Sequence, residues 1–319
     1  MIGLSRVAVR LPHSTEAVEE ILVRAGSEPM ERKMFAKVHG LRESPTLAED
    51  ESLEDLLVDA GRAVVGGQPV QLALYGHTQI SSDLDRSDGY LDGLRSRLGL
   101  SGTRFFGLSY INCASVLRSV ELARQFLARP EADPADRVLV LGGDQGSSYR
   151  DWARVTPGVT VGGDAAVGVL VHADAPERRP RYRYLGGAIG RDTRFHRGAR
   201  MSLQEADLFN VVWYEETART MLRAVEAAGL TPDQVDRVMP DLSNRMFWGK
   251  VGKRTGIPKD RFCLDLIPEL GHNFGSDALI ALEHADRTGR LRPGDRCLLC
   301  AVGLGAYFQA MIVEVREDS

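Results

Sequence analysis

The sequence predicts an α/β fold in which helices cover both faces of a sheet, and three observations support this prediction. Short apolar segments alternate with amphipathic segments at helical spacing along the whole chain. Two apolar segments, residues 137–141 and 165–171, are almost uninterrupted by polar residues, which is typical of strands covered on both faces. The third observation is an internal repeat that relates the two halves of the chain.

The expected elements of the first half begin with a helix over residues 53–65. Its apolar residues recur at helical spacing, and Gly66 and Gly67 end it. The elements expected after it are a strand at 70–75, a helix at 118–127, and strands at 137–141 and 165–171.

The second half repeats this alternation. The elements expected here are a helix at 215–228, a strand at 235–239, a helix at 277–288 and a strand at 296–302. The arginine-rich stretch 178–200 is expected to connect the halves over the surface, either as a solvated segment or as a basic patch for phosphate. We therefore expect two halves, residues 1–173 and 174–319.

The repeat appears when the halves are compared at an offset of 159 residues. Residues 134–141 then fall on residues 293–300, and Cys113 falls on His272. Each of these two residues stands just before an expected helix. Two halves related by a pseudo-two-fold axis would bring the two helix starts, and with them the two side chains, close together.

Composition limits the classes of protein that fit. The 319 residues are about twice a ~150-residue domain. A net charge of −4 disfavours nucleic acid as the main partner. No segment approaches the ~18 apolar residues of a membrane helix, and the first residues do not resemble a signal peptide. We expect a cytoplasmic protein with no membrane segment.

Cys113 is the candidate nucleophile among four cysteines. The start of a helix favours a thiolate, and its free N–H groups can stabilise an oxyanion. The alternative is a buried structural cysteine. Cys297 and Cys300 lie in an apolar strand, which would point them to opposite faces, so we expect no metal site there. Cys263 is expected to be structural.

Three further positions could contribute chemistry. His272 lies in a glycine-rich turn before a helix and could be a base or a loop residue. Asp241 follows a strand and could act at a site or cap a helix. Residues 303–305, Gly-Leu-Gly, could bring backbone amides close to a substrate or form a plain turn.

The chain resembles β-ketoacyl-ACP synthase III. The segment around Cys113, residues 162–167 and residues 289–305 carry the likeness. The resemblance implies a thiolase fold, with two duplicated βαβαβ halves in a five-layer αβαβα arrangement, usually as a homodimer. It also implies that Cys113 takes an acyl group from a thioester on CoA or on the phosphopantetheine of an acyl carrier protein, with no tightly bound cofactor and no metal.

The chain departs from the family pattern at two positions. The family's Pro-His-Gln-Ala-Asn reads Pro-Asp-Leu-Ser-Asn at residues 240–244, so Asp241 stands at the histidine position. Asn244 matches an asparagine of the pantetheine tunnel. The position of the family's catalytic asparagine holds His272 or, with a one-residue insertion, Asn273. This swap resembles a subgroup in natural-product and antibiotic pathways that transfers acyl groups to oxygen, nitrogen or sulfur.

The leading hypothesis is therefore an acyltransferase. Cys113 would carry the acyl group, His272 would act as base with Asp241 orienting it, and the backbone N–H groups of Cys113 and Leu304 would hold the oxyanion. An ionised Asp241 about 4 Å from an enolate would oppose it by about 4 kcal/mol at an effective dielectric of ~20. The alternatives are a decarboxylating β-ketoacyl synthase III and a catalytically silent subunit that binds a carrier protein.

Overall fold

The computed structural model describes residues 1–78, 89–175 and 178–317. The strands of its main sheet are β1 (Ile2–Leu4), β2 (Ala8–Arg10), β5 (Leu72–Gly76), β6 (Arg104–Leu108), β7 (Arg137–Gln145), β10 (Asp164–Ala173), β11 (Tyr182–Arg191), β12 (Arg237–Met239), β13 (Arg296–Gly303) and β14 (Tyr307–Val315). Two small hairpins pair β3 (Ser14–Ala17) with β4 (Glu43–Thr46) and β8 (Val155–Thr156) with β9 (Thr160–Val161).

The helices that bear on the argument are α1 (Val18–Arg24), α2 (Pro29–Met34), α3 (Leu53–Val65), α5 (Tyr90–Arg97), η2 (Asn112–Ala114), α6 (Ser115–Leu127), α8 (Leu203–Ala227), α9 (Arg245–Thr255), α10 (Ile267–Leu270), η8 (Phe274–Ser276) and α11 (Asp277–Arg287). None of the helices in the described ranges combines the length and the apolar character needed to cross a bilayer.

The main sheet consists of two halves with the same strand pattern. Its order is β12-β13-β14-β11-β1-β10-β7-β5-β6, with β2 beside β10. In the first half β5 is parallel to β6 and β7, while β10 is antiparallel to β7 and to β1. In the second half β12 is parallel to β13, and its Val238 forms a parallel bridge with Phe262. β14 is antiparallel to β13 and to β11. This match confirms the expected duplication.

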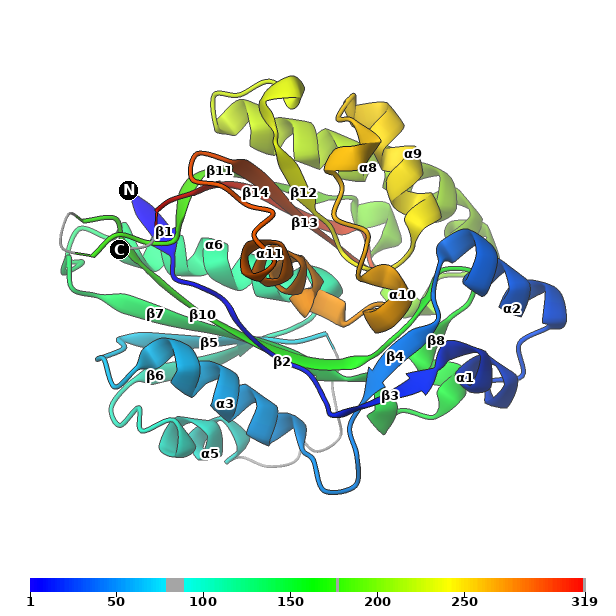
Figure 1. Ribbon diagram of the computed structural model, residues 1–319, viewed down its shortest axis with the longest axis horizontal. Helices are drawn as coiled ribbons and strands as arrows, with labels where there is room; N and C mark the ends of the chain where they lie inside the picture. Colours follow the sequence, from blue (N-terminus) through cyan, green and yellow to red (C-terminus); the bar gives the residue numbers. More distant parts are fainter. Residues whose placement is uncertain (79–88, 176–177, 318–319) are drawn as a thin grey trace.

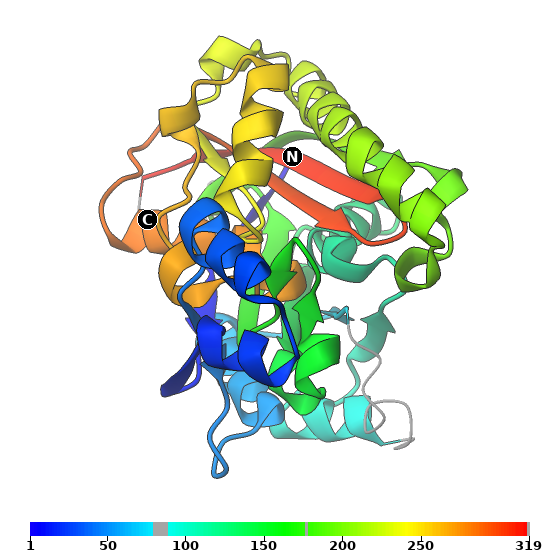
Figure 2. The same ribbon diagram turned by 90° about the vertical axis from the view of Figure 1, so that its right-hand side faces the viewer.

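Five layers result, because helices lie between the two half-sheets as well as outside them (Figure 1). The outer helices are α3 and α5 on one side and α8 and α9 on the other, and α6 and α11 occupy the middle. Figure 2 shows the long α8 lying across the second half-sheet. A helix between two sheets has to be apolar on most sides. In α11, residues 278–282 are accordingly five consecutive buried apolar residues.

The expected elements are present, but three features differ from the expectation. The arginine-rich stretch contains β11, in which buried Tyr182 and Ala188 alternate with partly exposed residues such as Arg183. The helix expected at 215–228 begins at Leu203, and β14 was not among the expected strands. The expected division at residue 173 falls at the end of β10, and the two-domain division stays a prediction.

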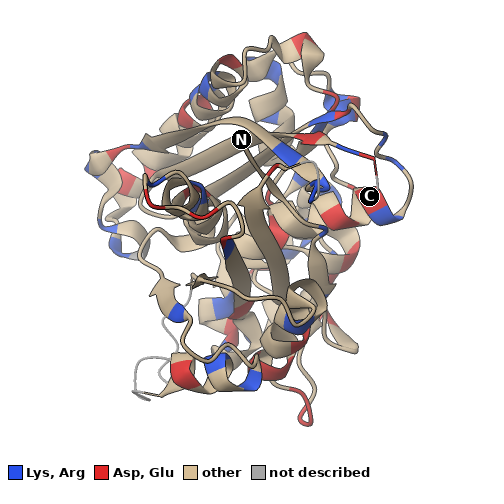
Figure 3. Ribbon diagram, turned by 90° about the vertical axis from the view of Figure 1, so that its left-hand side faces the viewer, with Lys and Arg blue, Asp and Glu red and all other residues tan. Residues whose placement is uncertain are grey.

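Charged residues lie mainly outside the layers that carry the core. Figure 3 shows blue and red segments interspersed over the outer helices and loops, while the strands are mostly uncharged. The largest apolar cluster includes Val116 and Leu117 of α6 and Leu279 and Leu282 of α11. The two central helices are therefore fixed by packing, and the segments that precede them are fixed as well.

Candidate active site

Cys113 lies in the short turn η2, directly before α6. It is 7% exposed. Asn112 donates a hydrogen bond from Nδ2 to the Leu304 carbonyl oxygen at 2.6 Å, which ties this turn to the chain after β13. Gly303 permits the approach, because a Cβ there would lie 2.2 Å from the Ile111 carbonyl oxygen. The nucleophile is thus held by both halves of the molecule.

His272 lies at the corresponding place in the second half, between α10 and η8. Its carbonyl oxygen accepts a hydrogen bond from the Gly163 N–H at 2.8 Å. The Nε2 atom of His272 lies 3.3 Å from the Cys113 sulfur. The structure therefore brings together the two residues that the repeat relates.

The carboxylate that holds the imidazole is Asp277, the first residue of α11. Its Oδ2 lies 2.5 Å from Nδ1 of His272. Asp241 was expected in this place, but its carboxylate bonds to Ser243 and not to Nδ1 of His272. The reason is local: the turn after His272 folds α11 back so that Asp277 reaches Nδ1, whereas Asp241 turns toward Ser243.

Asp277 is itself held by three hydrogen-bond donors. Its Oδ2 accepts from the Leu242 N–H at 2.7 Å as well as from His272, and its Oδ1 accepts from the Asn273 N–H at 2.7 Å. Asp241, His272 and Asp277 also have potential metal-ligand atoms within 4.8 Å of one another. Because both Asp277 oxygens already accept hydrogen bonds, this group fits a proton relay better than a metal site.

The electrostatics of the site favour a charged imidazole. Burial alone lowers the pKa of His272, but the Asp277 carboxylate and the Cys113 sulfur outweigh it and raise this pKa well above its usual value. Nε2 of His272 is close enough to the Cys113 sulfur to exchange a proton with it, and the deprotonated sulfur is the reactive form of a cysteine. The arrangement is therefore suited to nucleophilic attack on a thioester.

Asp241 follows β12 and is 3% exposed. Its Oδ1 accepts hydrogen bonds from the Ser243 hydroxyl at 2.5 Å and the Ser243 N–H at 3.2 Å. Trp248 donates from Nε1 to the Asp241 carbonyl oxygen at 2.6 Å. Burial raises the pKa of Asp241, against the opposing effects of His272 and Ser243.

The two asparagines named from the sequence lie beside the cavity rather than in it. Asn244 caps α9 by accepting from the Phe247 N–H at 2.7 Å, and it donates to the Val159 carbonyl oxygen at 3.1 Å. The amide of Asn273 donates to the carbonyl oxygens of residues 270 and 271. His272, not Asn273, therefore faces Cys113, and the pantetheine role of Asn244 stays a prediction.

Strained backbone surrounds the site. Four residues other than glycine have a positive φ among the described ranges: Tyr110 (65°), Asn112 (50°), Phe274 (54°) and Ala306 (56°). The first two precede Cys113, and the others follow His272 and Leu304 by two residues each. Such strain is concentrated at functional sites, where packing enforces it. The expected oxyanion role of the Cys113 and Leu304 N–H groups stays a prediction.

A cavity of about 240 Å³ opens onto these residues. Cys113, Asp241 and His272 line it, and aromatic side chains of α8, Phe209 and Trp213, form part of its wall. Among the described lining residues there is neither lysine nor arginine. The cavity is therefore mostly apolar, with a carboxylate, an imidazole and a thiol converging in it.

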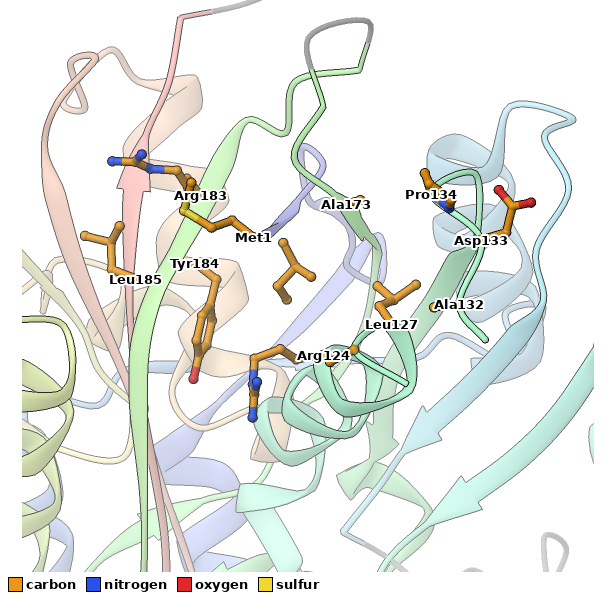
Figure 4. A pocket seen from close by; sticks show the side chains of 12 residues that line it. Met1, Arg124, Leu127, Ala132, Asp133, Pro134, Ala173, Arg183, Tyr184 and Leu185 are labelled. Atoms are coloured by element: carbon orange, nitrogen blue, oxygen red, sulfur yellow. The ribbon is translucent and has the colours of Figure 1, made fainter. Parts of the chain in front are cut away.

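A larger hollow of about 680 Å³ lies at the opposite end of α6 (Figure 4). Arg124 and Arg183 are the cationic side chains at its wall in the part of the chain that the structure describes. Arg124 pairs with Glu121, and Arg183 pairs with Glu314. Because both cations already have carboxylate partners, we assign no chemistry to this hollow.

The remaining cysteines lie away from the cavity. Cys297 and Cys300 are fully buried and belong to different apolar clusters, so the strand points them to opposite faces as expected. Burial raises the pKa of Cys263 to about 11. This burial is consistent with the structural role expected for it.

Comparisons with known proteins identify relatives of the chain. Residues 110–190 match the family described as 3-oxoacyl-[acyl-carrier-protein (ACP)] synthase III, and residues 225–315 match its C-terminal part. The β-ketoacyl-[acyl-carrier-protein] synthase III of Synechocystis sp. is 26% identical over 301 residues, which cover 86% of this chain and 87% of the relative.

Solved structures show the same fold. The synthase III of Thermus thermophilus superposes with a TM-score of 0.80 at 20% identity, covering 99% of this chain and 100% of the other. ChlB3, described as an acyltransferase, superposes with a TM-score of 0.82 at 21% identity, covering 99% and 98%. The chain thus has the thiolase fold that these structures share.

Proposed function

Because the chain belongs to the 3-oxoacyl-ACP synthase III family, we propose that it is an acyltransferase with a Cys113 acyl-enzyme. The donor is a thioester of CoA or of an acyl carrier protein, and the acceptor is a hydroxyl, amine or thiol. The observation that carries the proposal is the hydrogen-bonded series from Cys113 through His272 to Asp277. We place the reaction in the cytoplasm, in a natural-product pathway.

In the first half-reaction the Cys113 thiolate attacks the carbonyl carbon of the donor thioester. A C–S bond forms to Cys113, the donor's C–S bond breaks, and the leaving thiolate takes the proton of the His272 imidazolium. Acylation removes the negative charge on Cys113, one of the groups that raise the pKa of His272. The imidazole is then neutral and ready to act as a base.

In the second half-reaction the acceptor attacks the acyl carbon. His272 takes a proton from the acceptor at Nε2, while the C–S bond to Cys113 breaks and the thiolate returns. Asp277 holds Nδ1 and stabilises the imidazolium as it forms. No carboxyl group is lost in this reaction.

Decarboxylating condensation is the second candidate, because the curated relative is named as a synthase. Condensation creates an enolate, which needs hydrogen-bond donors. An oxygen of Asp241 lies within 4.8 Å of a ring nitrogen of His272. An ionised Asp241 about 4 Å from the enolate would raise its energy by about 4 kcal/mol at an effective dielectric of ~20. This repulsion favours transfer over condensation.

A catalytically silent carrier-binding subunit is the third candidate. The 3.3 Å contact between Cys113 and His272 and the Asp277 hydrogen bond behind it argue against silence. A silent subunit has no need of an aligned nucleophile and base.

The direct test is the intact mass of the protein after mixing with a panel of acyl-CoA thioesters. Wild type is expected to gain one acyl group, and Cys113→Ala is expected to gain none. Cys263→Ala is the matched control, because Cys263 is a more exposed free cysteine that lies away from the cavity. An adduct that survives in Cys113→Ala would contradict the proposal.

Carboxyl-labelled malonyl thioester separates the two enzymatic candidates. On the transfer mechanism the malonyl group is either rejected or moved intact, so label stays in the thioester or the product. Stoichiometric release of labelled carbon dioxide with a β-keto product would make the chain a condensing enzyme.

We also propose a homodimer formed through β6. Among the described residues this strand is the last of the sheet, and Phe106 on it is 55% exposed. An uncovered edge strand pairs readily with another chain. Light scattering of the wild type is expected to give twice the chain mass, and Phe106→Asp is expected to give the single chain. The control Val211→Asp, on an exposed face of α8, should stay dimeric, and a monomeric wild type would overturn the proposal.

A further inference from the structure

The carboxylate of Asp241 has one oxygen that opens on the cavity. Oδ1 is occupied by the Ser243 N–H and hydroxyl. Oδ2 accepts no hydrogen bond from the described residues, and it is not among the unpartnered atoms that are sealed inside the protein. Since Asp241 lines the cavity, Oδ2 is available to a ligand there.

The charged groups around Asp241 would allow a cation to bind beside it. The charged or titratable groups that line the cavity in the described ranges are Cys113, His272 and Asp241 itself. Both ring nitrogens of His272 already have partners, the Cys113 sulfur at Nε2 and the Asp277 carboxylate at Nδ1. Asp277 belongs to α11 and lies on the far side of the imidazole. In the acyl-enzyme His272 is neutral, so the buried carboxylate of Asp241 then has no cationic partner among the lining residues. Because such a carboxylate is costly, a cationic ligand would be stabilised at Oδ2.

We infer that the acceptor is an amine that binds as its ammonium ion against Asp241. This inference rests on the acyl transfer proposed above and names the acceptor class for the same cavity. A neutral alcohol or thiol would leave the carboxylate without a counter-charge, and an anionic acceptor would be repelled by it.

The number of bases in the cavity fits the number of protons that an ammonium ion must lose. The ammonium ion first gives one proton to Asp241, and the neutral amine then attacks the acyl carbon of the Cys113 thioester. A C–N bond forms and the C–S bond breaks. The second proton goes to Nε2 of His272, which restores the thiolate–imidazolium pair, and Asp241 returns its proton to solvent.

The environment of Asp241 supports its part in this reaction. Burial raises the pKa of Asp241, which makes the carboxylate a better proton acceptor than an exposed aspartate. An alcohol or thiol loses a single proton, for which His272 alone suffices. The second base therefore distinguishes an amine acceptor from the others.

The test uses preformed acyl-enzyme, freed of donor, and three probes with one skeleton: benzylamine, benzyl alcohol and benzyl mercaptan. Loss of the acyl mass and the mass of the product are followed together, with the spontaneous reaction of the acyl-CoA subtracted. Benzylamine is expected to be acylated fastest at neutral pH. Asp241→Asn is expected to slow release to benzylamine roughly 10- to 100-fold, as loss of a charged hydrogen bond does.

A pH series separates recognition of charge from a structural role. Above the pKa of benzylamine the probe is neutral, so the defect of Asp241→Asn should shrink there. Should Asp241→Asn not fold, Ser243→Ala removes the hydroxyl that stabilises the ionised carboxylate and should raise the KM for benzylamine. Asp265→Asn, which changes an exposed aspartate paired with His284, is the control and should behave as wild type.

The outcomes are distinct. Formation of acyl-enzyme with release to benzyl alcohol at least as fast as to benzylamine would overturn the amine assignment. No faster release to benzylamine than to buffer, or an Asp241→Asn defect that is the same at every pH, would overturn it as well. Failure to form acyl-enzyme would instead contradict the proposed acyl transfer itself.

Discussion

Replacing Asp277 by Asn tests which of the two carboxylates activates His272. Oδ2 of Asp277 lies 2.5 Å from Nδ1, and the side chain is almost completely buried. Asn keeps the shape but removes the charge. For charge centres about 4 Å apart at an effective dielectric of ~20, the lost stabilisation of the imidazolium is about 4 kcal/mol. That corresponds to roughly a thousandfold slower acylation of Cys113.

The same substitution also affects stability. Asp277 accepts hydrogen bonds from two backbone N–H groups, those of Leu242 and Asn273, in addition to the one from His272. An Asn side chain has one oxygen, so at least one of these buried donors is left unpaired, at a cost of about 1 to 3 kcal/mol. Acylation should therefore be measured by intact mass over time, below the Tm of the variant.

The companion variant is Asp241→Asn, because Asp241 also lies near His272 but does not bond to Nδ1. Its acylation rate is expected to fall much less than that of Asp277→Asn. The surface pair Asp265 and His284 provides the control, since Asp265→Asn removes an aspartate from a histidine far from the cavity. Near-wild-type acylation by Asp277→Asn, together with severe loss in Asp241→Asn, would refute the assignment of Asp277.

Two further predictions concern positions where packing or charge is unambiguous. Gly303→Ala should slow acylation at least tenfold or prevent folding, since its Cβ would lie 2.2 Å from the Ile111 oxygen; wild-type rates by intact mass would contradict this. Asp286→Asn should cost about 1 to 3 kcal/mol at neutral pH, because it removes the charge from a partly buried pair with Arg181. Burial alone would raise the pKa of Asp286, but Arg181 outweighs it and lowers this pKa. The stabilisation by Asp286 is therefore fully present above about pH 3.8, the ordinary pKa of an aspartate, and is lost as the pH falls through the lower pKa of the folded protein. Urea unfolding should accordingly give free energies for wild type and Asp286→Asn that converge at low pH. A difference in stability that persists in acid would contradict this prediction.

The pairing of Cys113 with His272 could be predicted from the sequence because the repeat gives both residues the same structural position. The identity of the second carboxylate could not. Asp277 is the first residue of a helix, where acidic residues are common for capping and dipole reasons, so it carries no distinguishing signal. Only the turn between His272 and α11 brings Asp277 to Nδ1, and the sequence of that turn has no periodic pattern from which its conformation could be predicted.

The helices and strands could be predicted from the spacing of their apolar residues where one face of the element is buried. The start of α8 could not be predicted in this way. Leu203, Leu208 and Val211 are exposed while other apolar residues of the same turns face inward, so the apolar residues do not show a helical period. In β11 the arginines at residues 183 and 191 suggested a solvated segment. The structure shows that they alternate with buried positions of a strand, and the arginine count concealed this alternation.

The distance along the chain between nucleophile and base has a consequence for how the protein is made. Cys113 and His272 are 159 residues apart, so their contact closes a very long loop and belongs to the late, non-local part of folding. At about 5 to 20 residues per second, synthesis of the intervening chain takes roughly 8 to 30 seconds. During that time the nascent first half carries the Cys113 thiol before His272 has been made. The rate at which Cys113 reacts with an alkylating reagent would therefore report, during refolding, the moment when the two halves dock.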